Sequence, residues 1–295
     1  MTVSVLVAVC TYRRLEDLEA LLDSMAVALD GRDADLLVVD NDPDGSAADL
    51  VRRHRAGARY LLCTSPGIAA ARNAALAERG TYGSIAFVDD DETVEPDWFD
   101  ALVAGAREYD ADVATGPVVS VYPVDAPAWV VRGGFLQRQR PATGTAVQYA
   151  ATNNVLIRNA ALDRLQVPWF DGTFSRSGGS DAELSWRLSR VGASIVWIDS
   201  AVVREVVPAD RLTKGWIGKR LVRGGNVSGR LQLREESRAA VLVLGARCAL
   251  VGALQTLRTL ALRRHLRADE VGMFAHGIGL LRAGAGLTIR EYARG

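Results

Sequence analysis

SIAFVDDDETVEPDWF, residues 84–99, passes directly from an apolar run into four consecutive acids, Asp89, Asp90, Asp91 and Glu92. The apolar run predicts a buried strand over 84–89, and DWFDALVAGAREY predicts a helix over 97–109. Carboxylates held this close repel one another, so another group has to offset that cost. The stretch therefore predicts a β-α unit whose connecting turn needs another group to offset the repulsion between its carboxylates.

The same β-α pattern occurs three times before this stretch. We expect strands at 3–9, 35–40 and 59–63, followed by helices at 15–29, from Ser46 and from about Ile68. Continuous apolar strands that alternate with helices are typical of a mainly parallel sheet covered on both faces. The predicted fold class is therefore α/β, with a mainly parallel sheet flanked by helices and a helical C-terminal appendage.

The chain after residue 112 is less regular. We expect strands at 112–121, 146–158, 194–199 and 201–207, a helix after the glycines of GGSDAE, and a mostly helical end. An arginine-bearing loop, QRQRPATGT, fits a lid, an acceptor-facing segment or an ordinary surface excursion.

The domain prediction follows this change of pattern. It gives one domain over 1–210, made of halves over 1–112 and 113–210. Residues 211–295 form a basic helical region.

Charge divides the chain in the same way. The formal net charge is zero, with 35 basic and 35 acidic residues, yet residues 204–295 alone carry 17 Lys and Arg against 7 Asp and Glu. Three widely spaced cysteines support neither a disulfide framework nor a zinc cluster, and the N-terminus lacks the pattern of a signal peptide. These features favour a cytoplasmic protein whose two parts meet different partners.

The residues just after each predicted strand form the candidate site, because ligands of such sheets bind beyond the carboxyl ends of the strands. Asp89 and Asp91 alternate along an extended segment and can point the same way, which suits Mg²⁺ or Mn²⁺ bound together with a diphosphate. The alternative is a solvated turn whose acids favour the start of the next helix. The two uses are compatible, because Glu95 and Asp97 suffice for the helix.

The order and spacing of VAVCTYRR, VVDNDPDG, SPGIAAARNAAL, FVDDDE and GGSDAELSWRL resemble family 2 glycosyltransferases of the GT-A fold, over about residues 3–235. The resemblance implies sugar transfer from a nucleoside diphosphate sugar, most often a UDP-sugar, to an acceptor with inversion. It also implies a divalent metal, Mn²⁺ or Mg²⁺, held by a DxD motif. By the same resemblance, residues 1–210 are the catalytic domain and contain the nucleotide-binding sheet, with a nucleotide-binding half over 1–112 and an acceptor and catalytic half over 113–210.

The resemblance assigns roles to individual residues of the donor side. The expected contacts with the nucleotide sugar come from these residues: Cys10, Thr11, Tyr12, Arg13, Asp40, Arg72, Asn73, Asp89, Asp90 and Asn154 or its neighbour Asn153. Among them Tyr12 would stack on the base, Arg72 would lie near the diphosphate and Asp89 would contact the ribose. Asp91 would hold the metal, and Asp90 stands at the variable middle position of the motif.

The catalytic base implied by the resemblance is Asp181 of GGSDAE, at the head of a helix, with Glu183 and Trp186 as neighbours that shape the site. A carboxylate there can take the proton of an attacking hydroxyl while the leaving diphosphate gains charge. On its sequence alone, Asp181 fits a helix N-cap equally well. One departure concerns the metal, because Glu205 in VVREVVP stands where many relatives have a histidine ligand.

The basic C-terminal part suggests a second kind of partner. RLTKGWIGKRLVRGGNVSGR (211–230) supplies cations that can close over the diphosphate, and the following apolar stretch carries Arg247 and Arg258. Peripheral binding to an anionic leaflet at the inner face of the membrane, a homo-oligomer interface and simple packing all fit this stretch. Nucleic acid does not, since interleaved aromatics and a reader motif are missing.

Two other functions remain compatible with these motifs. A nucleotidyltransferase would share the nucleotide-binding half, although TYRRLED lacks the glycine-rich loop that grips a triphosphate. A catalytically silent nucleotide-sugar binding or scaffold protein would explain Glu205 in place of histidine. The prediction we carry forward is a metal-dependent inverting glycosyltransferase.

Overall fold

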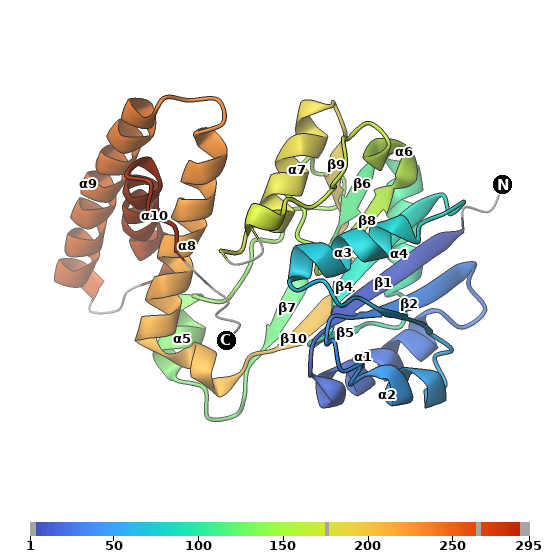
Figure 1. The fold of residues 1–295 in the computed structure, drawn as a ribbon. Helices are drawn as coiled ribbons and strands as arrows, with labels where there is room; N and C mark the ends of the chain where they lie inside the picture. Colours follow the sequence, from blue (N-terminus) through green and yellow to red (C-terminus); the bar gives the residue numbers. More distant parts are fainter. Residues whose placement is uncertain (1–3, 175–176, 264–266, 290–295) are drawn as a thin grey trace. The chain divides into compact units, whose positions relative to one another are not determined.

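The computed structural model describes residues 4–174, 177–263 and 267–289, and the chain divides into two compact units (Figure 1). Unit 1 comprises Met1–Val119, Arg138–Ser175 and Ser180–Glu205, and unit 2 comprises Ser120–Gln137, Arg176–Gly179 and Val206–Gly295. Each unit is therefore assembled from segments that are far apart in the sequence.

Unit 1 is built on a seven-stranded sheet in the order β3-β2-β1-β4-β8-β6-β9. The strands are β1 (Val5–Thr11), β2 (Ala34–Asp40), β3 (Arg59–Leu62), β4 (Ser84–Asp89), β6 (Val113–Thr115), β8 (Asn154–Arg158) and β9 (Ile195–Trp197). Only β8 among these seven runs against its neighbours, since it pairs antiparallel with both β4 and β6. The predicted mainly parallel α/β sheet is confirmed.

Helices cover both faces of this sheet because its central strands are apolar on both sides. Val5, Val7 and Val9 of β1 pack with α1 (Leu15–Ala28), α2 (Ala48–Arg53) and α4 (Trp98–Glu108). Leu6 and Ala8 of the same strand pack with α3 (Ile68–Ala77), α6 (Asn159–Leu162) and α7 (Ser180–Arg190). This two-sided alternation is what a buried parallel strand requires.

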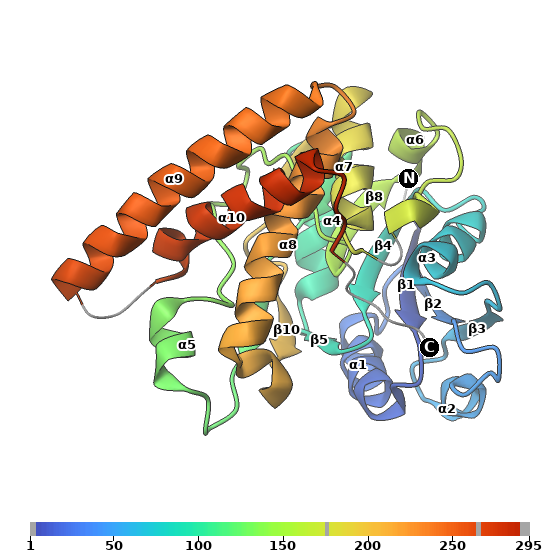
Figure 2. The same ribbon diagram turned by 60° about the vertical axis from the view of Figure 1, so that its left-hand side comes forward.

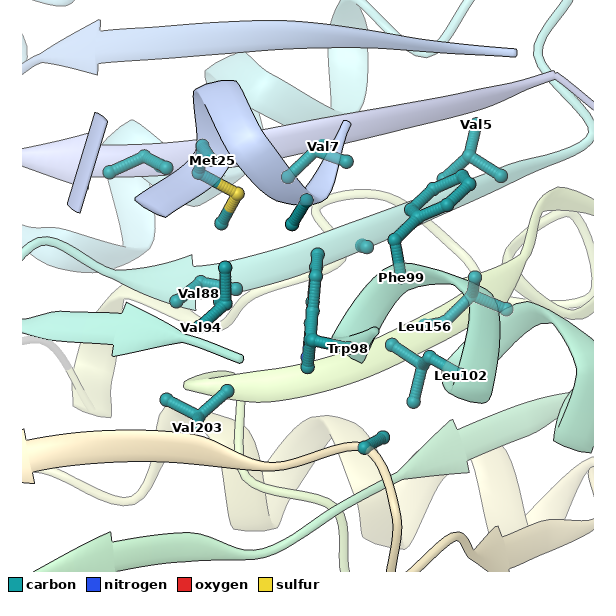
Figure 3. Close-up of a cluster of buried hydrophobic side chains, with 14 of the residues drawn as sticks. Val5, Val7, Met25, Val88, Val94, Trp98, Phe99, Leu102, Leu156 and Val203 are labelled. Carbon is teal, nitrogen blue, oxygen red and sulfur yellow. The ribbon is translucent and has the colours of Figure 1, made fainter. Parts of the chain in front are cut away.

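Trp98 lies near the centre of the first of these cores (Figure 3). Its side chain is fully buried, and its Nε1 donates to Oδ1 of Asn154 at 2.9 Å, so the one polar atom of the indole has a partner. The amide of Asn154 in turn donates to the carbonyl oxygens of Pro117 and Ala201. These hydrogen bonds hold the start of β8 against Pro117 and Ala201, next to the carboxyl end of β4.

Two predicted strands are shorter than expected. The strand predicted at 112–121 is interrupted at Gly116 and Pro117, which separate β6 from β7 (Val118–Val121). A Cβ at Gly116 would lie 2.3 Å from the carbonyl oxygen of Ala201, and Pro117 has no N–H to donate to a ladder. The strand predicted at 146–158 is regular only over Asn154–Arg158.

The acidic stretch contains an unpredicted strand, β5 (Glu92–Val94). It belongs to a three-stranded sheet in the order β5-β10-β7, where β10 is Val203–Val206. Glu92 is thus both the fourth acid of the run and the first residue of a strand, and in the antiparallel register it lies opposite Glu205.

Unit 2 is mainly helical, which confirms the expected helical C-terminal region. Its helices are α5 (Ala128–Gly133), α8 (Lys214–Gln232), α9 (Arg238–Arg263) and α10 (Ala268–Gly284), and α10 packs beside both α8 and α9 (Figure 2). Glycines allow this close approach: a Cβ at Gly225 of α8 would lie 2.2 Å from the carbonyl oxygen of His276 on α10.

Candidate active site

The strands β1 and β4 are neighbours in the sheet, but β2 and β3 lie on one side of them and the rest of the chain continues on the other. The strand order therefore changes direction between β1 and β4. Ligands of open α/β sheets bind at such a change in strand order, beyond the carboxyl ends of the strands. We call the residues at these two ends, Thr11–Arg14 and Asp89–Glu92, the strand-end rim. The predicted site residues Thr11 and Asp90 meet there, since the Thr11 hydroxyl donates to Oδ2 of Asp90 at 2.8 Å.

Arg14, which the sequence analysis did not single out, joins two acids of the rim. Its Nη1 donates to Oδ1 of Asp90 at 3.1 Å and to Oδ2 of Asp91 at 2.8 Å. Burial nevertheless raises the pKa of Asp90 to about 7, with Arg14 opposing that rise and Asp91 adding to it. The repulsion between these carboxylates is therefore only partly offset by the chain's own cation.

Arg72 connects the rim to the start of α7. Its Nη2 donates to Oδ1 of Asp89 at 3.1 Å, and its Nη1 donates to the hydroxyl of Ser180 at 3.2 Å. The guanidinium also lies 5.6 Å from the ring centroid of Phe170, which helps to fix it. Ser180 directly precedes Asp181, so one buried cation brings the acidic run and the predicted base to the same place.

The carboxylates on the two sides of Arg72 act on each other. Burial raises the pKa of Asp89, the cation of Arg72 opposes this, and the charges of Asp91 and Asp181 raise it further. An excess of negative charge thus converges on this edge of the sheet. Such a site is suited to a cation and to the phosphates that a cation carries.

Asp181 lies in the first turn of α7, and its two oxygens have different partners. Oδ1 accepts from the backbone N–H of Ala182 at 2.9 Å, and Oδ2 accepts from the hydroxyl of Tyr149 at 2.5 Å. Tyr149 is 48% exposed and was missed by the sequence analysis, because it lies 32 positions away on the segment before β8. The carboxylate is therefore held in one orientation at an accessible edge.

Glu92 is the central acid of a second set of contacts. It is 2% exposed, its Oε2 accepts from the backbone N–H of Asp89 at 3.1 Å, and its Oε1 accepts from Nδ2 of Asn153 at 2.8 Å. Arg138 donates to Asn153 at 3.2 Å and to Glu205 at 3.3 Å. Burial and then the charge of Asp89 raise the pKa of Glu92 well above its usual range.

Comparison with known proteins supplies the class of chemistry. Residues 6–166 match the model of the family described as Glycosyl transferase family 2. The chain belongs to this family. It is 34% identical over 235 residues to the succinoglycan biosynthesis protein ExoM of Rhizobium meliloti (strain 1021), a match that covers 78% of the chain and 75% of ExoM.

Solved structures of the GT-A fold are similar to this family 2 chain. GalNAc-T7 crystallised with UDP, GalNAc and Mn²⁺ matches at a TM-score of 0.55 and 12% identity, over 76% of this chain and 47% of that protein. TarS of S. aureus matches at a TM-score of 0.55 and 17% identity, over 93% of this chain and 55% of that protein. The chain spans about half the length of each structure, and the likeness confirms the predicted fold.

Several residues predicted to contact the donor of a family 2 enzyme are at the rim. Tyr12 is 36% exposed, and the guanidinium of Arg13 lies 5.4 Å from its ring centroid. Arg13 itself pairs with Asp42 at 2.9 Å and with Asp44 at 2.8 Å. Cys10 is opposite Asp89 in the β1–β4 register, and burial raises the pKa of its thiol to about 12. A thiol that stays protonated is not a nucleophile.

Three other predicted donor contacts are engaged within the protein. Asp40 is fully buried and accepts from the backbone N–H groups of Asp42 and Ala47 and from the Tyr60 hydroxyl. Asn73 uses both ends of its amide on the backbone of Phe170. Asn154 is bound to Trp98, Pro117 and Ala201. Each of the three thus holds parts of the chain together, and its predicted contact with the donor stays a prediction.

The two predicted metal ligands are paired with arginines. Asp91 is bound by Arg14, and Glu205 by Arg138 at 3.3 Å. Within residues 4–174, 177–263 and 267–289, no three His, Cys, Asp or Glu side chains are grouped so that they could hold a metal ion. A metal at the rim would therefore depend on few protein ligands and on oxygens supplied by a substrate.

Proposed function

We propose that this chain transfers a sugar from a nucleoside diphosphate sugar to an acceptor hydroxyl with inversion, and that Asp181 is the general base. The observation that carries the proposal is the bridge made by Arg72 between Asp89 and Ser180. It brings a candidate base and a candidate diphosphate site together around one buried cation. Inversion needs this pairing, because proton removal and departure of the leaving group occur on opposite faces of the reacting carbon.

The local contacts of Asp181 support its role. A general base must keep a free lone pair directed at the acceptor while its own orientation is fixed. The N–H of Ala182 and the hydroxyl of Tyr149 each occupy one lone pair on a different oxygen, and each carboxylate oxygen retains another. The proton of the acceptor hydroxyl would move to one of these oxygens as the bond to the sugar forms. Tyr149 is then a positioning residue, since it acts through Asp181.

The donor diphosphate would lie between Arg72 and the rim. Tyr12 offers an exposed ring for stacking on the base, with Thr11 and Arg13 beside it. UDP is the nucleotide we propose, because the structural neighbour GalNAc-T7 contains it and the resemblance of the motifs implies it. ExoM is named for succinoglycan biosynthesis, and by that likeness we propose a growing glycan as the acceptor. The three free cysteines favour the cytoplasm as the place of the reaction.

The donor set at the rim fits a divalent metal. The side chain of Asp91 is 20% exposed and carries hard carboxylate oxygens, and the charges of neighbouring acids add to the burial that raises the pKa values of Asp89, Asp90 and Glu92. When bound, Mn²⁺ or Mg²⁺ would neutralise charge that develops on the departing diphosphate. We assign Asp91 to hold it. Glu205 is the weaker candidate, because its side chain is 13% exposed, against 20% for Asp91, and each of the two already has an arginine as counter-ion.

Replacement of Asp181 by asparagine tests the proposal. Asp181→Asn keeps the hydrogen-bonding shape but cannot take a proton, so we expect kcat for UDP release with Mn²⁺ to fall by roughly 10²- to 10⁴-fold. Binding of the donor, followed by thermal shift, should persist. The matched control is Asp163→Asn, since Asp163 pairs with Arg79 and is 60% exposed. Equal turnover by the parent protein and Asp181→Asn would exclude Asp181 as the base.

A second function is favoured by one observation. Glu205 stands where the resemblance places a histidine ligand, and Arg138 binds it. A protein that binds nucleotide sugars without turning them over could keep the donor contacts and lose the metal in this way. Donor binding without turnover by the parent protein, across a panel of nucleoside diphosphate sugars with and without Mn²⁺, would support this alternative.

A further inference from the structure

The helix α9 of unit 2 exposes most of its large apolar side chains. It is long and apolar enough to cross a membrane by length and composition, yet only 17% of its most apolar window is buried. The exposed members of this set, at 36–70% relative exposure, are Leu242, Val243, Leu244, Leu250, Val251, Leu254, Leu257, Leu260 and Leu262. An apolar surface of this extent is rare on a soluble protein and marks an interaction site.

The side of α9 that packs against α10 has small residues instead. A Cβ at Gly252 would lie 2.2 Å from the backbone nitrogen of Phe274, and a Cβ at Gly277 would lie 2.3 Å from the backbone nitrogen of Ala249. Small residues let the two helix backbones approach closely, so the large apolar side chains of α9 point away from α10. The leucines are therefore not a core that merely lacks a neighbour within unit 2.

The charges of α9 distinguish between a second copy of the chain and a lipid surface. Between Arg238 and Arg263 the sequence has no Asp or Glu. Arg247 and Arg258 are both exposed and are eleven residues apart, about three helical turns, so they lie on the same side of α9. The exposed Leu254 is seven residues after Arg247 and four before Arg258, so it lies on that side too. A two-fold dimer through this face would bring arginines together without counter-charges. The phosphates of an anionic bilayer supply those charges.

We propose that the outward face of α9 binds the surface of an anionic lipid bilayer. Its leucines enter the boundary between acyl chains and headgroups, and Arg247 and Arg258 extend to lipid phosphates. The helix lies in the interface and does not cross the bilayer. A crossing α9 would draw α10 and, through it, the basic helix α8 toward the hydrocarbon, and α8 carries Lys214, Lys219, Arg220, Arg223 and Arg230. This inference is independent of the reaction.

The test is flotation of the full chain with vesicles. We expect binding to vesicles of phosphatidylcholine and phosphatidylglycerol at 7:3, binding weakened at least about tenfold on vesicles of phosphatidylcholine alone, and further weakening at high salt. The triple variant Leu250→Gln, Leu254→Gln, Leu257→Gln should lower the partition coefficient by about tenfold or more. The matched control, Leu62→Gln, Val124→Gln, Val167→Gln, changes three apolar residues that are also exposed but lie outside α9. It should bind as the parent does.

Two further measurements keep the proposal falsifiable. Arg247→Gln with Arg258→Gln should remove most of the preference for anionic vesicles, and circular dichroism should show unchanged helix content in every variant. Sodium carbonate at pH 11 should release the bound protein. Retention of the protein on the vesicles after carbonate would overturn the interfacial placement of α9. Equal flotation of the α9 triple variant and of the control triple variant would show that α9 is not the membrane-binding site. A stable dimer in buffer that fails to bind vesicles would assign α9 to a second copy of the chain.

Discussion

The strand-end rim and the outward face of α9 depart in opposite ways from the usual separation of apolar interior and charged surface. At the rim, acids are buried: Asp90 is 6% exposed and Glu92 2%. On α9, Leu254 and Leu257 are 61% and 63% exposed. The helix α1 shows the ordinary case, with Leu18, Leu21 and Leu22 fully buried. Local rules are broken mainly where a protein has a function, and each departure indicates what completes that region.

The chemistry missing from each region is different. At the rim, burial raises the pKa values of Asp89 and Asp90 although Arg72 and Arg14 oppose it, so a further cation would stabilise the charged carboxylates. The face of α9 lacks apolar surroundings and negative charge. A metal with a nucleoside diphosphate would complete the first region, and an anionic bilayer the second. Substitutions in the strand-end rim leave the outward face of α9 unchanged, and substitutions in α9 leave the rim unchanged.

The largest effect is expected at the rim, from Asp91→Asn. Loss of this carboxylate should remove the activation by Mn²⁺ and lower kcat/KM by about a thousandfold, equivalent to ~4 kcal/mol. The measurement is UDP release over a Mn²⁺ titration, with the melting temperature as a check on folding. Asp97→Asn is the control, because Asp97 is exposed at the start of α4 and makes no capping hydrogen bond. Unchanged metal activation in Asp91→Asn would remove the metal from the rim.

Leucine truncation compares α9 with an ordinary helix. Leu22→Ala in α1 should cost about 2–5 kcal/mol of the free energy of unfolding, because it leaves a cavity in a closed core. Leu254→Ala in α9 should change it by less than about 0.5 kcal/mol, because that side chain is exposed. Urea denaturation in lipid-free buffer measures both. If Leu254→Ala cost as much as Leu22→Ala, the outward face of α9 would be a core in solution.

The sequence predicted the repeated β-α units of unit 1 because each strand and helix has its own local pattern. Strand ends and motif order singled out Thr11, Asp90, Arg72 and Asp89, which the hydrogen bonds of the structure join in two pairs, and the role of each stays a prediction. The sequence analysis missed Arg14, Arg138 and Tyr149, whose partners are 15 to 77 positions away and depend on how the sheet is assembled. It also missed β5, because a short strand that begins at an acid has no periodicity to reveal it.

The assignment of Asp40, Asn73 and Asn154 to the donor shows the same limit. A polar residue after a strand can face a ligand or satisfy nearby backbone groups, and both uses favour the same residue types. Only the three-dimensional contacts distinguish them. For α9, the sequence showed apolar residues but not their orientation, which depends on Gly252 and Gly277 packing inward.

Effects smaller than that of Leu22→Ala are expected from two single methyl groups added to the α9–α10 pair. Gly252→Ala should cost about 1–3 kcal/mol, because the new Cβ would lie 2.2 Å from backbone of α10 and the helices would have to separate. Gly272→Ala should instead stabilise by about 0.5–1 kcal/mol, because a Cβ at that position of α10 meets nothing within 4 Å and alanine is the better helix former. Urea denaturation followed by circular dichroism at 222 nm, a wavelength that reports helix, should show opposite signs. Equal stabilisation by both changes would mean that the side of α9 facing α10 can accept a methyl group without moving the helices apart. The small residues there would then no longer explain why the leucines point outward.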